Sequence, residues 1–456
     1  MVNPTTGIAG GRGLASGAYA YRISSVAAIG GLLFGFDTAI INGAIVFLKR
    51  QFAWTEVQTE IAASSLLFGC VLGVSAAGAL SDWLGRRRLL VWSATLFAIS
   101  SLATALPNSL WQFCAARVVA GMAIGMASML APLYIAEISP AAIRGRLVSL
   151  NQMAIVSGIL ISYLVGWLLA GMGEESWRWM FASAVVPSVL FLIALFFVPE
   201  SPRWLVKEGR DNESLDILRR IDQEGASQRL TEIKAALREE TGSAADLFKP
   251  GMRRPMLIGI TLAILQQITG INTILYYGSI IFTEQVGEKS ASAALFANVV
   301  IGSVNFVCTI AALFVIDRIG RRALLMIAAG GMGVSLAAVG ILFRTSASAA
   351  LPILTLMLSY VAFFAIGMGP TVWVVLSELF PTKIRGRAMS VATISLWLAC
   401  LLITLTFLSL VKALTVSGAF WLYGAMCAFT VFFVWRFTIE TKGKTLEEIE
   451  LNWLKK

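Results

Sequence analysis

The chain has 456 residues, of which 57% are hydrophobic and only 14% charged, and its net charge is +10. A soluble protein of this size carries about 25% charged residues, so the composition indicates a membrane protein whose positive charge requires no nucleic-acid partner. The absence of histidine excludes Ser–His–Asp triads and histidine metal sites, and no G-x-x-x-x-G-K-S/T motif occurs to bind phosphates. We therefore expect neither an enzyme nor an ATP-driven pump, and no cofactor or metal.

Apolar stretches of about 20 residues follow one another along nearly the whole chain, and each is long enough to cross a bilayer. We predict twelve transmembrane helices, at residues 22–48, 60–81, 89–106, 110–136, 147–171, 178–198, 256–282, 292–316, 323–343, 351–377, 388–411 and 418–437. Residues 199–255 are the exception, because they are charged and amphipathic. The predicted fold class is an all-α membrane protein with a small helical segment outside the membrane.

Two motifs occur twice, which indicates two similar halves. Residues 137–146 and 378–387 share a glutamate, a proline and the ending I-R-G-R, and residues 78–87 and 313–322 share an aspartate and the ending G-R-R. We predict an N-terminal six-helix half at 1–198, a cytoplasmic helical linker at 199–255, a C-terminal six-helix half at 256–437 and a cytoplasmic tail at 438–456. Parallel repeats of hydrophobic helices are typical of transporters that bind their substrate between the halves.

Lysine and arginine are concentrated in alternate loops. If the spans alternate in direction, one side of the membrane receives Arg86, Arg87, Arg88, Arg144, Arg146, Arg318, Arg321, Arg322, Lys383, Arg385 and Arg387. The loops on the other side hold few positive charges. Because positive charge marks the cytoplasmic side, we expect a multi-pass protein of the cell (inner) membrane with both termini in the cytoplasm.

Two charged residues lie well inside the predicted spans, Asp37 in the first and Arg117 in the fourth. A charge at the centre of a membrane helix costs about 2.5–3.5 kcal/mol, so such residues usually have a function. The two spans are antiparallel, and a long arginine side chain should reach the aspartate. One interpretation is an ion pair that fixes helix packing. We favour the other, a proton site in which Asp37 is protonated when Arg117 moves away.

The spans of the second half carry uncharged polar residues instead. Gln266, Asn272 and Tyr276 are spaced to share one face of a straight helix, whereas Gln267 joins them only if Gly270 bends the run. Further candidates inside spans are Gln152, Asn305 and Trp373. Amides donate and accept hydrogen bonds, and an aromatic ring can cover the apolar face of a sugar. The set favours a neutral, hydroxyl-rich ligand; the alternative is hydrogen bonding between helices.

Taken together, these features resemble the sugar porter family of the major facilitator superfamily over essentially the whole chain. Besides the two G-R-R turns, the motifs are A-E-I-S-P-A-A-I-R-G-R at 136–146, P-E-S-P-R-W-L at 199–205, Q-Q-I-T-G-I-N at 266–272, E-L-F-P-T-K-I-R-G-R at 378–387 and I-E-T-K-G at 439–443. The resemblance implies the major facilitator fold. It implies that Asp37 and Arg117 couple a proton to transport, and that the polar positions contact sugar: Gln152, Gln266, Gln267, Asn272 and Asn305, with Tyr276 and Trp373 nearby.

The resemblance also implies a cytoplasmic latch, a network of ion pairs that joins the halves when the site faces outward. Its candidate residues are Asp82, Arg86, Glu137, Arg144, Glu200, Arg203, Asp317, Arg321, Glu378, Arg385 and Glu440. Trp83 departs from the family pattern, because it replaces a basic residue and so weakens the latch. Ile159 and Leu396 are apolar where relatives carry amides, which leaves the identity of the sugar open.

The sequence thus predicts a secondary active transporter, a monomeric unit that moves a hexose or pentose across the membrane with a proton. One alternative is a passive sugar facilitator, in which Asp37 and Arg117 form a static pair. The other is a sugar sensor that does not transport, which the short tail at 438–456 disfavours.

Overall fold

The computed structural model describes residues 12–140, 143–239, 250–287, 290–345, 350–380 and 385–442. Within these ranges the chain is almost entirely helical and contains no strand. The helices up to the end of the first half are α1 (Arg12–Gln51), α2 (Glu56–Leu84), α3 (Arg86–Ala105), α4 (Leu110–Ile138), α5 (Arg144–Leu169), the short η2 (Ala170–Met172), α6 (Ser176–Ser183) and α7 (Val185–Leu195).

Three short helices follow and then the second half. The short helices are α8 (Pro202–Lys207), α9 (Asp211–Ile221) and α10 (Ala226–Glu239). The second half consists of α11 (Pro250–Ile268), α12 (Ile271–Ile280), η4 (Ile281–Gln285), α13 (Ala291–Ile319), α14 (Arg321–Arg344), α15 (Ala350–Phe363), η5 (Phe364–Met368), α16 (Gly369–Leu379) and α17 (Arg385–Phe437).

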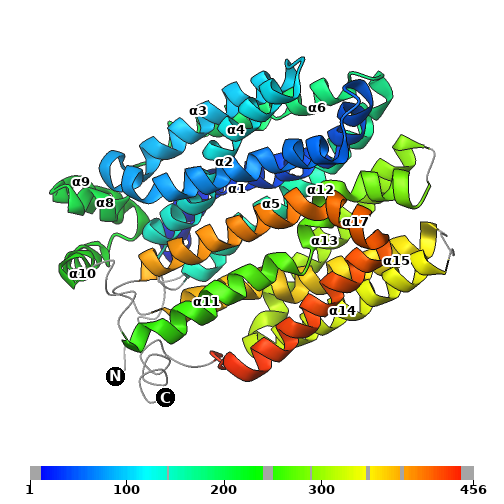
Figure 1. Cartoon of the computed structure of the whole chain (residues 1–456). Coiled ribbons are helices and arrows are strands. Elements are labelled where there is room, and N and C mark those ends of the chain that lie inside the picture. The colour runs from blue at the N-terminus through cyan, green and yellow to red at the C-terminus, as the bar shows by residue number, and fades with distance from the viewer. Residues whose placement is uncertain are drawn as a thin grey trace, which may run out of the picture.

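The twelve predicted spans are present. Eleven helical segments of the described chain are long and apolar enough to cross a membrane. One of them, Arg387–Phe437, holds two spans, because Thr415 (φ 65°, ψ 167°) interrupts the helical backbone of α17. Figure 1 shows the orange and red parts of α17 running in opposite directions as a hairpin.

Prolines account for two places where a span is divided into consecutive helices. Pro187 lies in the first turn of α7, which continues the span begun by α6, and Pro370 lies in the first turn of α16, after the π-helical η5. Proline is tolerated in the first turn, where its missing N–H has no partner to lose, but its ring disrupts the preceding turn.

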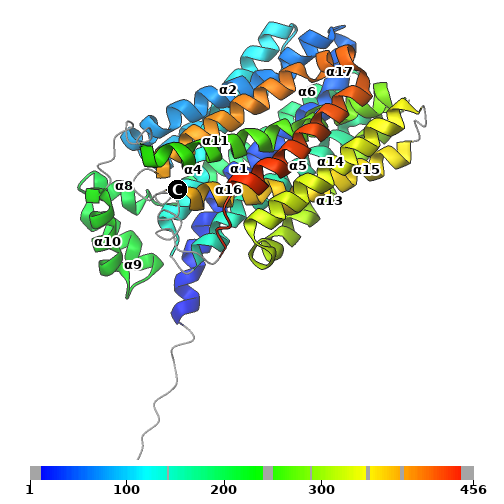
Figure 2. The same cartoon turned by 60° about the horizontal axis from the view of Figure 1, so that its bottom comes forward.

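Helices α8, α9 and α10 lie together at one end of the bundle (Figures 1 and 2). Their sequence explains why they stay outside the spans, since α9 buries Leu218 and Ile221 while charged side chains cover its other face. We call this end of the molecule the linker end. The opposite end, where α1 ends at Gln51 and α2 begins at Glu56, is the distal end. Part of the predicted linker, residues 240–249, and the tail from 443 lie outside the described residues.

Small residues allow α2 and α4 to pack in close contact. A Cβ atom on Gly69 would lie 2.1 Å from a carbonyl oxygen of α4, and one on Gly121 would lie 2.0 Å from a carbonyl oxygen of α2. Gly35 and Gly158 play the same part between α1 and α5. Because lipid solvates apolar side chains, helices in a bilayer associate through such close backbone packing rather than through the hydrophobic effect.

The outer surface of the bundle is apolar. Trp92, Val334 and Leu402 are 59%, 73% and 58% exposed, respectively, and other large apolar side chains surround the spans in the same way. So large an apolar surface would be unfavourable in water but meets lipid tails in a bilayer. The surface therefore agrees with the composition in indicating a multi-pass membrane protein.

We expect Gly121→Ala to lower the free energy of unfolding by about 1–3 kcal/mol, because the added methyl group overlaps a carbonyl oxygen of α2 and forces the helices apart. Gly330→Ala in α14 is the matched control, since a Cβ atom there meets no atom within 4 Å. The midpoint of thermal unfolding in detergent should fall for the first variant and hold or rise for the second. Equal midpoints would contradict this packing.

Candidate functional site

A buried ion pair lies inside the first half. Nη1 of Arg117, on α4, donates a hydrogen bond to Oδ2 of Asp37, on α1, at 2.6 Å. The side chains are 0% and 3% exposed, respectively. The guanidinium carbon of Arg117 also lies 5.2 Å from the centre of the Phe181 ring of α6, a favourable cation–π contact. The two charged residues predicted inside the spans are therefore direct partners.

Two of the three nitrogens of the Arg117 guanidinium have no hydrogen-bond partner among the described residues, because only Nη1 is engaged while Nε and Nη2 are buried and unpaired. The hydroxyls of the buried Tyr276 of α12 and Thr38 of α1 likewise make no well-formed hydrogen bond among the described residues. Buried polar groups are usually satisfied, so unpaired donors at this depth suit a polar ligand or an alternative arrangement.

The seventh span is broken rather than straight. Gly270 has φ 94°, a left-handed conformation that suits glycine, and it separates α11 from α12. The expectation that Gln266, Asn272 and Tyr276 share one face of a continuous helix is therefore wrong. The helical spacing of these residues does not continue across the break. The structure instead contains the bend at Gly270, the condition under which we expect Gln267 to join them. A Cβ atom at this glycine would lie 2.8 Å from the Tyr423 ring.

The break brings three side-chain amides into one chain of hydrogen bonds. Gln267 Nε2 donates to Gln266 Oε1 at 3.3 Å, and Asn272 Nδ2 donates to Gln267 Oε1. Asn272 also donates to the Cys400 sulfur at 3.0 Å. All three amides are buried. Since an amide can exchange such partners for the hydroxyls of a ligand, this cluster can bind a neutral polar molecule.

Gln266 connects the amide cluster to the interruption of the tenth span. Its Nε2 donates to the carbonyl oxygens of Met368 at 3.3 Å and Gly369 at 2.8 Å. These carbonyls lie where η5 gives way to α16, and Trp373 follows one turn later and is half-buried. The two interrupted spans therefore meet through a side chain at the level of the candidate site.

The remaining predicted sugar residues lie on two helices that pack together, α5 and α13. Asn305 of α13 is 6% exposed, and its carbonyl accepts a bond from Thr309, whereas Gln152 of α5 is half-buried. The described contacts do not connect either side-chain amide to Gln267 or Asn272. The structure thus joins the amides of α11 and α12 but leaves these two apart from them.

Two contacts across the halves were not predicted from the sequence. Phe34 of α1 packs edge-on against Trp397 of α17, with ring centres 5.3 Å apart. The Tyr163 hydroxyl of α5 donates to the carbonyl oxygen of Leu275 in α12 at 3.2 Å. An aromatic residue within an apolar run is indistinguishable by sequence from one that faces lipid, so neither contact had a sequence signal.

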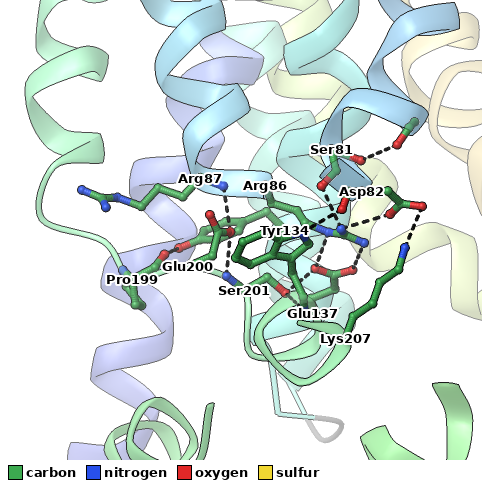
Figure 3. Close-up of polar contacts among 12 residues, drawn as sticks. Ser81, Asp82, Arg86, Arg87, Tyr134, Glu137, Pro199, Glu200, Ser201 and Lys207 are labelled. Atoms are coloured by element: carbon green, nitrogen blue, oxygen red, sulfur yellow. Dashed lines mark hydrogen bonds and ion pairs between the residues drawn. The ribbon is translucent and has the colours of Figure 1, made fainter. Parts of the chain in front are cut away.

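The latch residues of the first half form a compact network at the linker end (Figure 3). Arg86 donates to Glu137 from Nε at 3.1 Å and from Nη2 at 3.2 Å, and to Asp82 at 3.2 Å. Glu200 accepts the backbone N–H groups of Arg87 at 2.9 Å and Ser201 at 2.8 Å. The carboxylates thereby tie α2, α3, α4 and the start of the linker together.

The second half repeats this network with its own residues. Arg321 donates to Glu378 at 3.1 Å, and Glu440 accepts the backbone N–H groups of Arg321 at 3.0 Å and Arg322 at 3.1 Å. Burial acts to raise the pKa of Glu440, but backbone N–H groups, including that of Lys442, bind its charged form and lower the pKa overall. The duplicated motifs thus have equivalent structures.

Each described ion pair of the predicted latch joins two residues that belong to the same half. We expected bridges between the halves when the linker end is closed; instead, Arg86 pairs with Asp82 and Glu137 of its own half, and Arg321 pairs with Glu378 of its own half. Arg144 is exposed and Arg203 is half-buried, while the side chains of Asp317 and Arg385 lie outside the described part of the chain.

Arg229 of α10 is a linker residue that sequence reasoning missed. Its Nη2 donates to the carbonyl oxygens of Glu137, Ile138 and Ser139 at the C-terminal end of α4. Burial, together with the nearby positive charge of Arg144, lowers the pKa of Arg229. An arginine at a helix C-terminus satisfies free carbonyls and the negative end of the dipole, so Arg229 attaches the linker to the first half.

At the distal end, polar contacts join the two halves. Ser279 of α12 donates its backbone N–H to Asn42 Oδ1 at 2.7 Å and its hydroxyl to the Asn42 carbonyl. The ammonium of Lys49 lies 2.7 Å from the carboxylate of Glu284. These bonds connect α1 directly to α12 and η4, so the halves are closed against each other at this end.

A model of the family described as "Sugar (and other) transporter" matches residues 23–453. The chain belongs to this family. An arabinose-proton symporter of Bacillus subtilis (strain 168) is 39% identical over 441 residues, which cover 95% of each chain. A D-xylose-proton symporter of Escherichia coli (strain K12) is 39% identical over 476 residues, covering 95% of this chain and 96% of the relative.

Solved structures of the xylose transporter XylE from E. coli share the fold. A partially occluded inward open conformation has a TM-score of 0.84 and 36% identity, covering 94% of this chain and all of that one. The proton:xylose symporter XylE bound to 6-bromo-6-deoxy-D-glucose has a TM-score of 0.82 and 38% identity, covering 96% and 99%. The predicted family and the major facilitator fold are thereby confirmed, and the family consists of transporters rather than enzymes.

We expect Glu137→Ala to lower the free energy of unfolding by about 1.5–3 kcal/mol, because the buried Arg86 loses a charged acceptor. Asp82→Ala is the control, since this carboxylate is 53% exposed and bonds the same arginine. Its midpoint of thermal unfolding should change little. If both variants lost the same stability, burial would not govern the strength of this network.

Proposed function

We propose that the protein is a secondary active transporter that moves a monosaccharide, a hexose or pentose, inward together with a proton by alternating access. The named relatives at 39% identity are proton symporters for arabinose and xylose, which supports both the sugar and the proton. The observation that carries the proposal is the buried pair of Asp37 and Arg117. In this pair, Asp37 is a titratable group inside the spans, and its partner Arg117 is a cation that can move away from it.

In the proposed proton step, Arg117 neutralises Asp37 in the state described here. A conformational change that draws Arg117 away leaves a buried carboxylate without its cation, and such a group takes up a proton rather than remain charged. In this proposal, sugar binding changes how the two halves pack and thereby the position of Arg117. Sugar binding and protonation are thus coupled through one guanidinium.

In the proposed binding step, the sugar hydroxyls replace the internal bonds of the amide cluster. Gln267 and Asn272 provide both donors and acceptors, and Gln266 positions them from the interruption of the tenth span. Tyr276 offers an unpaired hydroxyl, and Trp373 offers a ring surface. Gln152 and Asn305 contact the sugar when the halves approach each other. These uncharged groups suit a neutral ligand.

In the proposed cycle, residues 1–198 and 256–437 move as two bodies about the site. The lysines and arginines at the linker end support placing it on the cytoplasmic side of the inner membrane. Because the distal end is closed in this structure, we expect the site to open toward the cytoplasm in this state. In the opposite state, latch residues such as Arg86 and Arg321 exchange partners and bridge the halves. One chain suffices as the transport unit.

We expect Asp37→Asn to abolish accumulation of sugar against a gradient, because position 37 can no longer exchange a proton, while downhill exchange survives. The measurement is uptake of labelled hexoses and pentoses into proteoliposomes, with and without an imposed pH gradient. Asp216→Asn, an aspartate of α9 that is 67% exposed and pairs only locally with Arg219, is the matched control and should still accumulate sugar. Concentrative uptake by Asp37→Asn would contradict the proton site and favour a passive facilitator or another coupling group.

We expect Gln267→Ala and Asn272→Ala each to weaken sugar binding by about 1–3 kcal/mol, since a buried ligand hydroxyl loses its partner. Isothermal calorimetry with the sugar transported best measures the loss. Asn151→Ala is the matched control, because this buried amide faces Gly31 of α1 instead of the cluster. Unchanged affinity in both cluster variants would move the site away from the seventh span.

A further inference from the structure

A buried carboxylate links the two halves at the distal end. Glu60 lies one turn into α2, whose start is defined by a capping box between Thr55 and Gln58. It is 2% exposed. Its Oε1 accepts the backbone N–H of Ser409 at 2.7 Å, and its Oε2 accepts the Ser409 hydroxyl at 2.6 Å. Ser409 belongs to α17, so a single side chain of the first half binds the backbone of the second.

The contact between the halves on α5 is built differently. There the Tyr163 ring packs on Gly302 of α13, where an added Cβ atom would lie 2.8 Å from the ring. Its hydroxyl makes one bond to a backbone carbonyl. That contact depends mainly on the close packing of the ring against the glycine, whereas the contact between α2 and α17 depends on hydrogen bonds to both oxygens of one carboxylate.

The surroundings of Glu60 make it dependent on Ser409. No ion pair of Glu60 occurs among the described residues: Lys49 pairs with Glu284 at 2.7 Å and with Glu56 at 3.6 Å, and Lys412, three residues after Ser409 on α17, is not within ion-pair distance of the Glu60 carboxylate. The other titratable groups that interact with it are the phenols of Tyr277 and Tyr423. When α2 and α17 separate, both hydrogen bonds of the carboxylate break together.

We propose that Glu60 is a gating residue of the transport cycle, whose bonds to Ser409 hold the distal entrance closed and must break before the site opens on that side. The inference rests on the proposed alternating-access function. In the closed state Ser409 satisfies the carboxylate, and in the open state water does. The Glu60 carboxylate is therefore hydrogen-bonded in both the closed and the open state. The free energies of the two states can then be similar, which allows the gate to move in both directions.

Spin labels on Trp111 and Leu351 report the state of the gate. These side chains are 70% and 73% exposed, and they lie at the distal ends of α4 and α15, one in each half. We expect Glu60→Ala to increase the ratio of open to closed molecules about tenfold or more, which corresponds to about 1.4 kcal/mol. Glu60→Gln, which keeps an acceptor for the Ser409 N–H, should give an intermediate ratio.

The partner variant makes the test specific. Ser409→Ala should shift the distance distribution in the same direction, but it should have no further effect in the Glu60→Ala background, because the hydroxyl has already lost its acceptor. Glu175→Ala is the matched control, a carboxylate at the distal end that is 63% exposed and pairs with Arg178 of the same half, and it should leave the distribution unchanged. The thermal midpoint of each variant verifies that it is folded.

An unchanged distribution in Glu60→Ala, or effects of the two substitutions that simply add, would overturn the assignment. The distance measurement needs neither sugar nor a proton gradient. A failure of the proposed proton coupling would therefore appear in the Asp37→Asn uptake experiment and leave this result intact. Conversely, if Glu60→Ala left the distance distribution unchanged, the proposal of proton-coupled sugar transport would not be affected.

Discussion

The pairing of Asp37 with Arg117 is the interaction on which the organisation of the first half depends. In hydrocarbon neither charge can be satisfied by solvent, so the two helices that carry them, α1 and α4, must be held in register. Phe181 adds α6 to the arrangement through its ring. Because only one nitrogen of the guanidinium is used, the pair retains donors for another arrangement. A static structural pair would be expected to use more of them.

The two halves are alike at the linker end and different in the middle of the membrane. Arg86, Glu137 and Glu200 have counterparts in Arg321, Glu378 and Glu440, with the same sequence of bonds from arginine to carboxylate and from backbone to carboxylate. In the middle, the first half has an ion pair and the second has amides. This division is consistent with a proton handled by one half and a sugar by the other, with their relative movement coupling the two.

Interrupted helices are the means by which the second half presents polar groups. At Gly270 and at η5 the helical pattern is relaxed, and side-chain amides and backbone carbonyls come within reach of each other. Irregular backbone at membrane depth is tolerated only where protein or water satisfies it. The amide cluster provides that satisfaction here, and it does so with bonds that a sugar can replace. In the proposed gate, the Glu60 carboxylate would likewise exchange its Ser409 donors for water when the distal end opens.

The sequence by itself determined the number of spans, because bilayer thickness imposes a length on every apolar run. It determined the two halves through the duplicated motifs, and it identified Asp37 and Arg117 because charges inside such runs are few. Only the tertiary structure decided which polar groups are partners. Gln267 meets Asn272 because Gly270 is left-handed, which residue spacing on a straight helix cannot express. Glu60 stands at the edge of an apolar run and looks like an ordinary end-of-helix charge, yet it binds a residue 349 positions away. Local sequence shows which groups need a partner, whereas the packing of helices distant in the chain decides who the partner is.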